Sequence, residues 1–145
     1  MPSLDYVQGR VVACYLDDCH FLTSTGWQHL VTSLHSRQYH TSAPTSKGLL
    51  LVGGYNSSSA TELVEGAATR EGFTLHNQRE GHCSIQLSDS SIVLTGGYSS
   101  LSLVTEYSDI HQQEASPREL GSLLTGRYGH ACGSYLVADK QVTLI

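Results

Sequence analysis

The chain has 145 residues, enough for one domain or a piece of one. Lys and Arg total 8 against 13 Asp and Glu, a formal net charge of -5, and the basic residues are scattered. This excludes a basic surface for a phosphate backbone, so we expect no nucleic-acid partner. Only 14% of the residues are charged, while Ser, Thr and Gly are abundant, which predicts an all-β protein.

Residues 1–36 predict a partial first repeat unit, in which "GWQHL" around Trp27 forms a strand. The stretch contains no basic segment followed by a long apolar run, so we expect no signal peptide in this chain. No later segment approaches the roughly 18 consecutive apolar residues of a membrane helix, so we expect no membrane span.

Residues 37–78 predict a complete unit of four short strands. It opens with "RQYH" and continues as "TSAPTSKGLLLVGG", two strands with a turn at Lys47 and Gly48. "ATELVE" from Ala60 supplies a third strand, and "GFTLHN" around Phe73 supplies a fourth.

Residues 79–126 repeat this plan, opening with "REGH" and continuing as "SIQLSDSSIVLTGG" and "VTEYSD". We align Thr105-Glu106 with Thr61-Glu62, because these pairs follow the first glycine of each doublet at 9 and 8 residues. The polar stretch "IHQQEASPREL" predicts a lengthened loop. Residues 127–145 open with "RYGH" and predict the start of a further, truncated repeat. Four strands in each unit of about 40 to 50 residues are typical of a propeller blade.

These units resemble the kelch repeat: an Arg and a His open the unit, an apolar strand ends in Gly-Gly, a strand with an aromatic or acidic residue such as Tyr107 follows, and a Trp precedes the next Arg. The resemblance implies an all-β, kelch-type β-propeller fragment with four-stranded antiparallel blades. Phe73 stands where a Trp is expected, and no Trp precedes Arg127. The matching residues are Arg37, His40, Gly53, Gly54, Arg79, His82, Gly96, Gly97, Arg127, His130 and Trp27.

The repeated residues are expected to be structural. Glycine doublets at strand ends permit positive φ and close packing. Arg and His that recur in every unit are more often framework residues bonding loop carbonyls than ligands, because architecture must repeat and function rarely does.

We find no residues for catalysis or a cofactor. Asp17, Asp18, Cys19 and His20 are consecutive, so on a strand they point to opposite faces and do not converge on a metal. "SDIH" places Asp109 and His111 on one face but offers no third ligand. Some kelch propellers are copper-radical oxidases, but their ligand set does not map onto this sequence. We therefore expect a protein that is not an enzyme.

A non-catalytic protein-protein interaction module is the function that the resemblance implies, with loops at one face binding a peptide or protein. The alternative is a fragment of an extracellular or secreted kelch protein, glycan-binding or part of a propeller enzyme such as a copper oxidase. Open blade edges are also expected to permit self-association. Besides positions beside the Arg openings, the predicted contact residues are Tyr55, Asn56, Ser57, Tyr98, Ser99 and Ser100.

The cysteines leave the redox compartment open. Cys14 and Cys19 could bridge locally, whereas Cys83 and Cys132 are expected to pack as small buried hydrophobic residues. One sequon begins at Asn56 and favours an extracellular over a cytoplasmic location.

Overall fold

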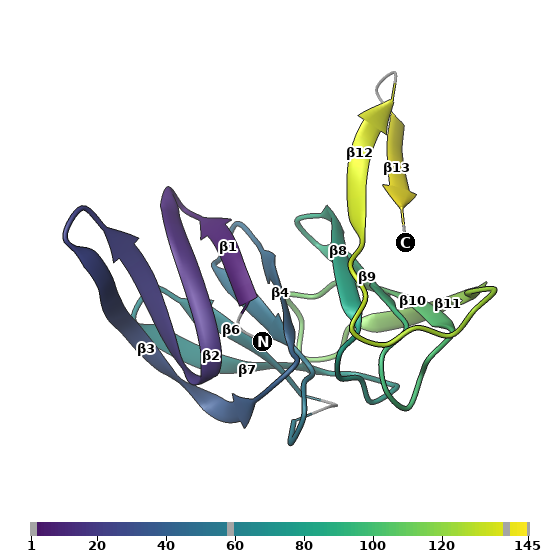
Figure 1. Ribbon diagram of the computed structural model, residues 1–145, viewed down its shortest axis with the longest axis horizontal. Coiled ribbons are helices and arrows are strands. Elements are labelled where there is room, and N and C mark those ends of the chain that lie inside the picture. Colours follow the sequence, from purple (N-terminus) through teal and green to yellow (C-terminus); the bar gives the residue numbers. More distant parts are fainter. Residues whose placement is uncertain (1–2, 58–59, 138–139, 145) are drawn as a thin grey trace.

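The computed structural model describes residues 3–57, 60–137 and 140–144. Within these ranges every regular element is a β-strand, and the strands pair antiparallel with their neighbours along the chain (Figure 1). The predicted all-β fold is therefore confirmed. None of the described residues belongs to a helix that could cross a membrane.

The first sheet has three strands in the order β1-β2-β3, formed by β1 (Ser3–Val7), β2 (Arg10–Thr23) and β3 (Gly26–Arg37). The β2–β3 register shifts twice, between Leu16 and Asp18 and between Cys19 and His20. A disulfide joins Cys14 to Cys19, whose Cα atoms are 4.1 Å apart. Since five extended residues would span about 17 Å, the strand bends sharply between the two cysteines.

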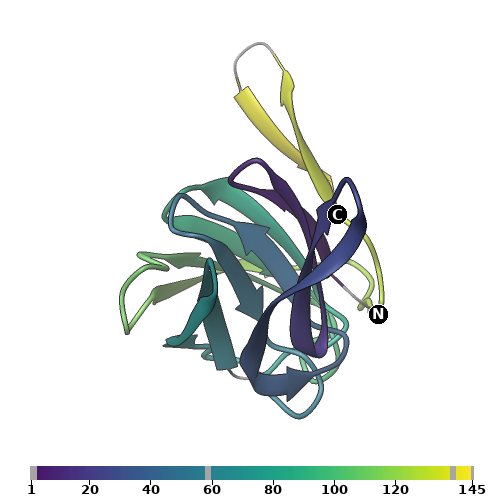
Figure 2. The same ribbon diagram turned by 90° about the vertical axis from the view of Figure 1, so that its left-hand side faces the viewer.

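The next two sheets have four strands each, in chain order. The second sheet contains β4 (Thr41–Pro44), β5 (Leu49–Val52), β6 (Ala60–Glu65) and β7 (Ala68–Thr74). The third contains β8 (Cys83–Ser88), β9 (Ser91–Thr95), β10 (Leu103–Ser108) and β11 (Ser116–Ser122). A hairpin of β12 (Gly133–Val137) and β13 (Lys140–Leu144) follows and projects away from the other sheets (Figures 1 and 2).

The predicted long loop is shorter than expected. Its second part forms strand β11, and the connection before this strand comprises only residues 109–115. The strand lies at the sheet edge and all its residues are exposed, so no apolar alternation marks it in the sequence. Pro117 is tolerated because an edge strand has a side without ladder hydrogen bonds. The Arg118 guanidinium pairs with the Glu106 carboxylate of β10.

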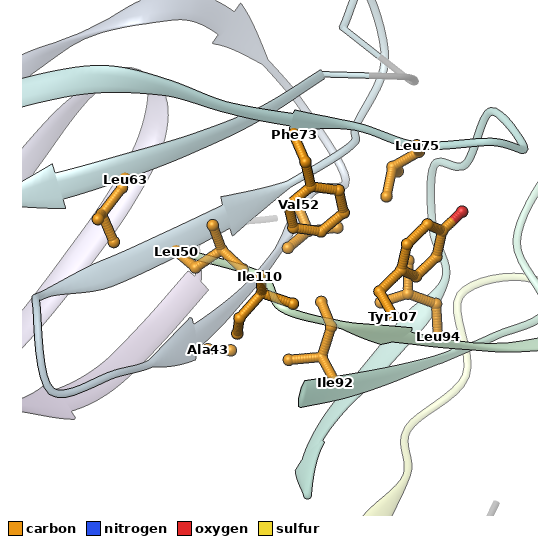
Figure 3. Packing of buried hydrophobic residues seen from close by; sticks show 10 residues of the cluster. All are labelled: Ala43, Leu50, Val52, Leu63, Phe73, Leu75, Ile92, Leu94, Tyr107 and Ile110. Atoms are coloured by element: carbon orange, nitrogen blue, oxygen red, sulfur yellow. The ribbon is translucent and has the colours of Figure 1, made fainter. Parts of the chain in front are cut away.

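The core consists of two clusters, one on each face of the second sheet. All four residues of β5 are buried. Leu49 and Leu51 face the first sheet, whereas Leu50 and Val52 face the third. A strand buried on both faces requires a continuous apolar run, which explains "LLLV". Figure 3 shows the cluster between the second and third sheets. In this cluster the Phe73 ring packs on Tyr107, with ring centroids 5.3 Å apart.

Trp27 and Phe73, which the repeat pattern aligns, lie in different environments. Phe73 is 1% exposed in the core, but Trp27 is 50% exposed near the end of the β2–β3 hairpin, opposite Leu22. The aligned aromatics therefore do not have the same packing role in these two sheets.

The expectation for Cys83 and Cys132 is wrong, because they form a disulfide. This bond ties the first strand of the third sheet to the segment that precedes β12. The partners are 49 residues apart, so the pairing arises only when the chain returns beside β8.

Replacing both Cys83 and Cys132 with Ser should lower the free energy of unfolding by about 4 kcal/mol, as expected from the entropy of closing a loop of this length. The Cys14–Cys19 disulfide closes a much shorter loop, so the matched Cys14→Ser, Cys19→Ser variant should lose only about 2 kcal/mol. Urea unfolding followed by circular dichroism measures both. Equal losses would contradict the loop-length argument.

Candidate functional site

Two buried arginines fix the ends of the strands that terminate in Gly-Gly. Arg37 is fully buried, and its Nη1 donates to the carbonyl oxygens of Gly53 and Ala60, each at 3.2 Å. In the next repeat, Nη1 of Arg79 donates to the carbonyls of Gly96 and Leu103 at 3.0 Å. Each guanidinium therefore ties the end of one strand to the start of the next.

The third hydrogen bond of each arginine shows that the alignment of Thr61-Glu62 with Thr105-Glu106 is wrong by one residue. Arg37 Nη2 donates to Glu62 Oε2 at 3.2 Å, and Arg79 Nη2 donates to Thr105 Oγ1 at 2.6 Å. Glu62 is thus equivalent to Thr105, and Glu106 instead pairs with the exposed Arg118. Burial lowers the pKa of both buried guanidinium groups, and the Glu62 charge opposes this shift only at Arg37.

The repeated histidines bond to hydroxyl groups in neighbouring strands. His40 Nε2 lies 3.1 Å from Ser3 Oγ, and His82 Nε2 lies 2.8 Å from Thr41 Oγ1. Both contacts reach the first strand of the preceding sheet. In the third opening, His130 Nε2 lies 2.8 Å from the hydroxyl of Thr95.

Main-chain hydrogen bonds join the Arg-x-x-His loops of successive repeats. The third residue of each loop, Tyr39, Gly81 or Gly129, has a left-handed φ of 56°, 59° or 64°. Gly81 N donates to Tyr39 O at 2.8 Å, and Gly129 N donates to Gly81 O at 2.7 Å. The three loops therefore form one continuous surface.

The loops after the glycine doublets join the same surface. Tyr55 N donates to Gln38 O at 2.6 Å, and Tyr98 N donates to Glu80 O at 2.9 Å. Gly54 has a φ of +103°, and a Cβ there would come within 2.8 Å of the Gln38 carbonyl oxygen. The doublet thus satisfies both a left-handed backbone and a close approach, which only glycine allows without strain.

Four tyrosines lie on these joined loops, and we call Tyr39, Tyr55, Tyr98 and Tyr128 the tyrosine surface. Their exposed fractions range from 41% to 63%. The Tyr128 ring centroid is 6.3 Å from that of Tyr39 and 6.3 Å from that of Tyr98. Tyr128 lies against Gly81, where a Cβ would come within 2.5 Å of the ring carbon Cε2. Glycine at this position therefore leaves the space that the ring occupies.

A depression of about 290 Å³ lies beside these rings and is lined by Tyr55, Asn56, Glu80, Tyr98 and Ser99. Four of the predicted contact residues meet there. The other two, Ser57 and Ser100, are half-buried and donate their hydroxyls to the carbonyls of Ser36 and Gln78.

The sequence predicts contact positions beside the Arg openings but does not single out Tyr39, Glu80 and Tyr128 among them. They stand inside the Arg-x-x-His openings, where the repeated Arg and His dominate the pattern. Their variable identity between the openings is the signal that could have distinguished these exposed positions from the framework.

The rejected metal-binding candidates have other partners. Cys19 is in a disulfide, and Asp18 Oδ1 lies 3.3 Å from His29 Nε2. His111 Nε2 lies 3.3 Å from the carboxylate of Asp89 rather than from that of Asp109. In the part of the chain that the structure describes, no group of three or more His, Cys, Asp or Glu side chains could hold a metal ion.

The geometry defines an all-β protein of successive antiparallel sheets that presents an aromatic surface on its connecting loops. No protein-family model matches the chain, and no curated protein has a matching sequence.

Replacing Glu62 with Ala should destabilise the protein by about 3–5 kcal/mol, because the Arg37 charge would be left buried without its partner. Glu106→Ala is the matched control and removes only a pair with an exposed arginine, which should cost about 1 kcal/mol or less. Urea unfolding compares the two. A larger loss of stability for Glu106→Ala than for Glu62→Ala would contradict the equivalence of Glu62 with Thr105.

Stability should fall as the pH is lowered from 6.5 towards 4.5. Burial, reinforced by the charge of the neighbouring arginine, lowers the pKa of His82 to about 3 and that of His40 to about 4. In this pH range the unfolded chain binds protons that the folded chain excludes. Each of these histidines therefore lowers the free energy of unfolding by about 1.4 kcal/mol per pH unit once its unfolded form is protonated.

Thermal and urea unfolding between pH 4.5 and 7 measure this slope. His82→Gln should reduce the slope, and the control His76→Gln at an exposed position should leave it unchanged. The same slope in the parent protein and in both variants would contradict the assignment of the pH dependence to the buried histidines.

Proposed function

We propose that this chain is a non-catalytic binding segment of a kelch-type β-propeller, and that its tyrosine surface holds an extended peptide segment of a protein partner. The propeller assignment is supported by two consecutive four-stranded antiparallel sheets with equivalent buried arginines. Packing of each sheet against the next supports the same arrangement.

The tyrosine surface is the observation that carries the binding function. Its rings are about half exposed, although their loops are held by main-chain hydrogen bonds to one another. Tyrosine presents a large amphipathic area with few rotatable bonds, so binding through it costs little conformational entropy. Asn56 and Ser99 beside the rings offer hydrogen-bonding groups for a peptide main chain.

An extracellular or otherwise oxidising compartment is part of the proposal. Two disulfides favour it, because cytosolic thiols are generally kept reduced. Asn56, the acceptor residue of the sequon, is exposed, which is compatible with the same compartment. A glycan attached there would cover part of the depression, so the binding experiment below uses protein without it.

Panning a displayed library of random peptides against the disulfide-bonded protein should yield ligands that depend on the tyrosine surface. For such a peptide, Tyr98→Ala should weaken binding about tenfold or more, in the range of an interface hot spot. Isothermal titration calorimetry measures the affinity, and thermal unfolding verifies the fold.

Tyr6→Ala is the matched control, because Tyr6 in β1 is 68% exposed and Tyr98 is 63% exposed. Its substitution should leave the affinity unchanged. If every selected peptide binds the Tyr98→Ala and Tyr128→Ala variants as tightly as it binds the parent protein, the proposal that peptides bind the tyrosine surface is wrong.

A further inference from the structure

Glu80 is the one formally charged residue among those that line the depression. Its side chain is half-buried beside the exposed rings. Among the described residues its carboxylate has no hydrogen bond and no ion pair, although its main-chain carbonyl accepts from Tyr98. The Glu80 side chain lines the depression together with Tyr55 and Tyr98. Burial raises the pKa of the Tyr128 phenol, and the negative charge of Glu80 adds to this shift. An anion in this position is available to a ligand.

The rings of the tyrosine surface present their faces in different directions. The Tyr128 plane is tilted by 54° from Tyr39 and by 79° from Tyr98. A cation is attracted to an aromatic face within about 6 Å of its centroid, and the attraction increases when the site is partly desolvated. Partly exposed tyrosines at different tilts therefore offer several faces to one cation.

The net charge of the chain and the burial of the two arginines beneath the surface favour the same ligand. Arg37 and Arg79 beneath it are fully buried, and their Nη donors are bonded to main-chain oxygens and to Glu62 or Thr105. Arg127, which directly precedes Tyr128, is exposed, and its charge adds to burial in lowering the pKa of His130. With a net charge of -5, the chain as a whole attracts cations.

We propose that the tyrosine surface and Glu80 together bind a cationic side chain of the partner peptide, preferably an arginine. This inference rests on the proposed peptide-binding function and specifies its ligand chemistry. A guanidinium suits the site better than an ammonium, since it stacks on aromatic rings and donates two parallel hydrogen bonds to a carboxylate.

The test compares N-acetyl-arginine amide with N-acetyl-citrulline amide, which has nearly the same shape and no charge. Nuclear magnetic resonance of protein labelled on its tyrosine rings follows each titration. The arginine compound should bind about tenfold more tightly than the citrulline compound, as expected for combined ring and carboxylate contacts. Its binding should shift the signals of Tyr98 and Tyr128 and weaken at high salt.

Glu80→Gln keeps the side-chain shape and should remove most of the preference for arginine over citrulline. The control Glu114→Gln changes an exposed carboxylate in the β10–β11 connection and should leave the preference intact. Equal melting temperatures establish that the variants are folded. Tyr128→Leu should weaken the arginine compound without creating a preference for citrulline.

Equal affinities for the two compounds, or no binding of either, would overturn this inference. Selected peptides that lack basic residues but depend on Tyr98 would leave the proposed peptide-binding function standing without the cation. The peptide-binding function itself would be overturned, together with the cation preference, only if no selected peptide depended on the tyrosine surface. Binding of neutral oligosaccharides to the same tyrosines, with no effect of Glu80→Gln, would replace the cationic peptide with a glycan.

Discussion

The buried guanidinium groups of Arg37 and Arg79 connect the fold to the loop surface. Each donates to two main-chain carbonyls, one at the end of a glycine-terminated strand and one at the start of the next strand. Burying a guanidinium is costly unless its donors are satisfied, so these carbonyls must stay in place for the charge to be tolerated. Through this constraint, the interior determines where each exposed loop begins and ends.

Main-chain hydrogen bonds to this framework hold the surface loops in place. Glycine doublets bring the loops after β5 and β9 against the Arg-x-x-His openings, where main-chain hydrogen bonds hold them. Tyr128 can lie against Gly81 because no Cβ occupies that space. Exposed aromatics on a fixed main chain lose little entropy when they bind, which supports the proposed binding of a peptide. The proposed preference for a cationic side chain depends on one carboxylate, that of Glu80, in the depression beside the rings.

Much of the fold could be predicted because local patterns mark it. The apolar runs before each glycine doublet form β5 and β9, and the Lys47-Gly48 turn precedes β5. The failures have physical causes. Strand β11 has no buried face, so no alternation reveals it. Glu62 and Glu106 look equivalent in the sequence, but a one-residue offset puts only Glu62 beside a buried arginine. In a strand, such an offset reverses the face on which a side chain lies.

The sequence alone determined the all-β class, the recurrence of the units and the loops on which the candidate contacts lie, because these follow from local periodicity and glycine placement. The tertiary structure decided which distant side chains meet. It paired Cys83 with Cys132 and assembled Tyr39, Tyr98 and Tyr128 from three separate loops. It also placed Glu80 beside Tyr55 and Tyr98. These contacts join residues tens of positions apart, and the packing of one sheet against the next sets their distances, which no local pattern encodes.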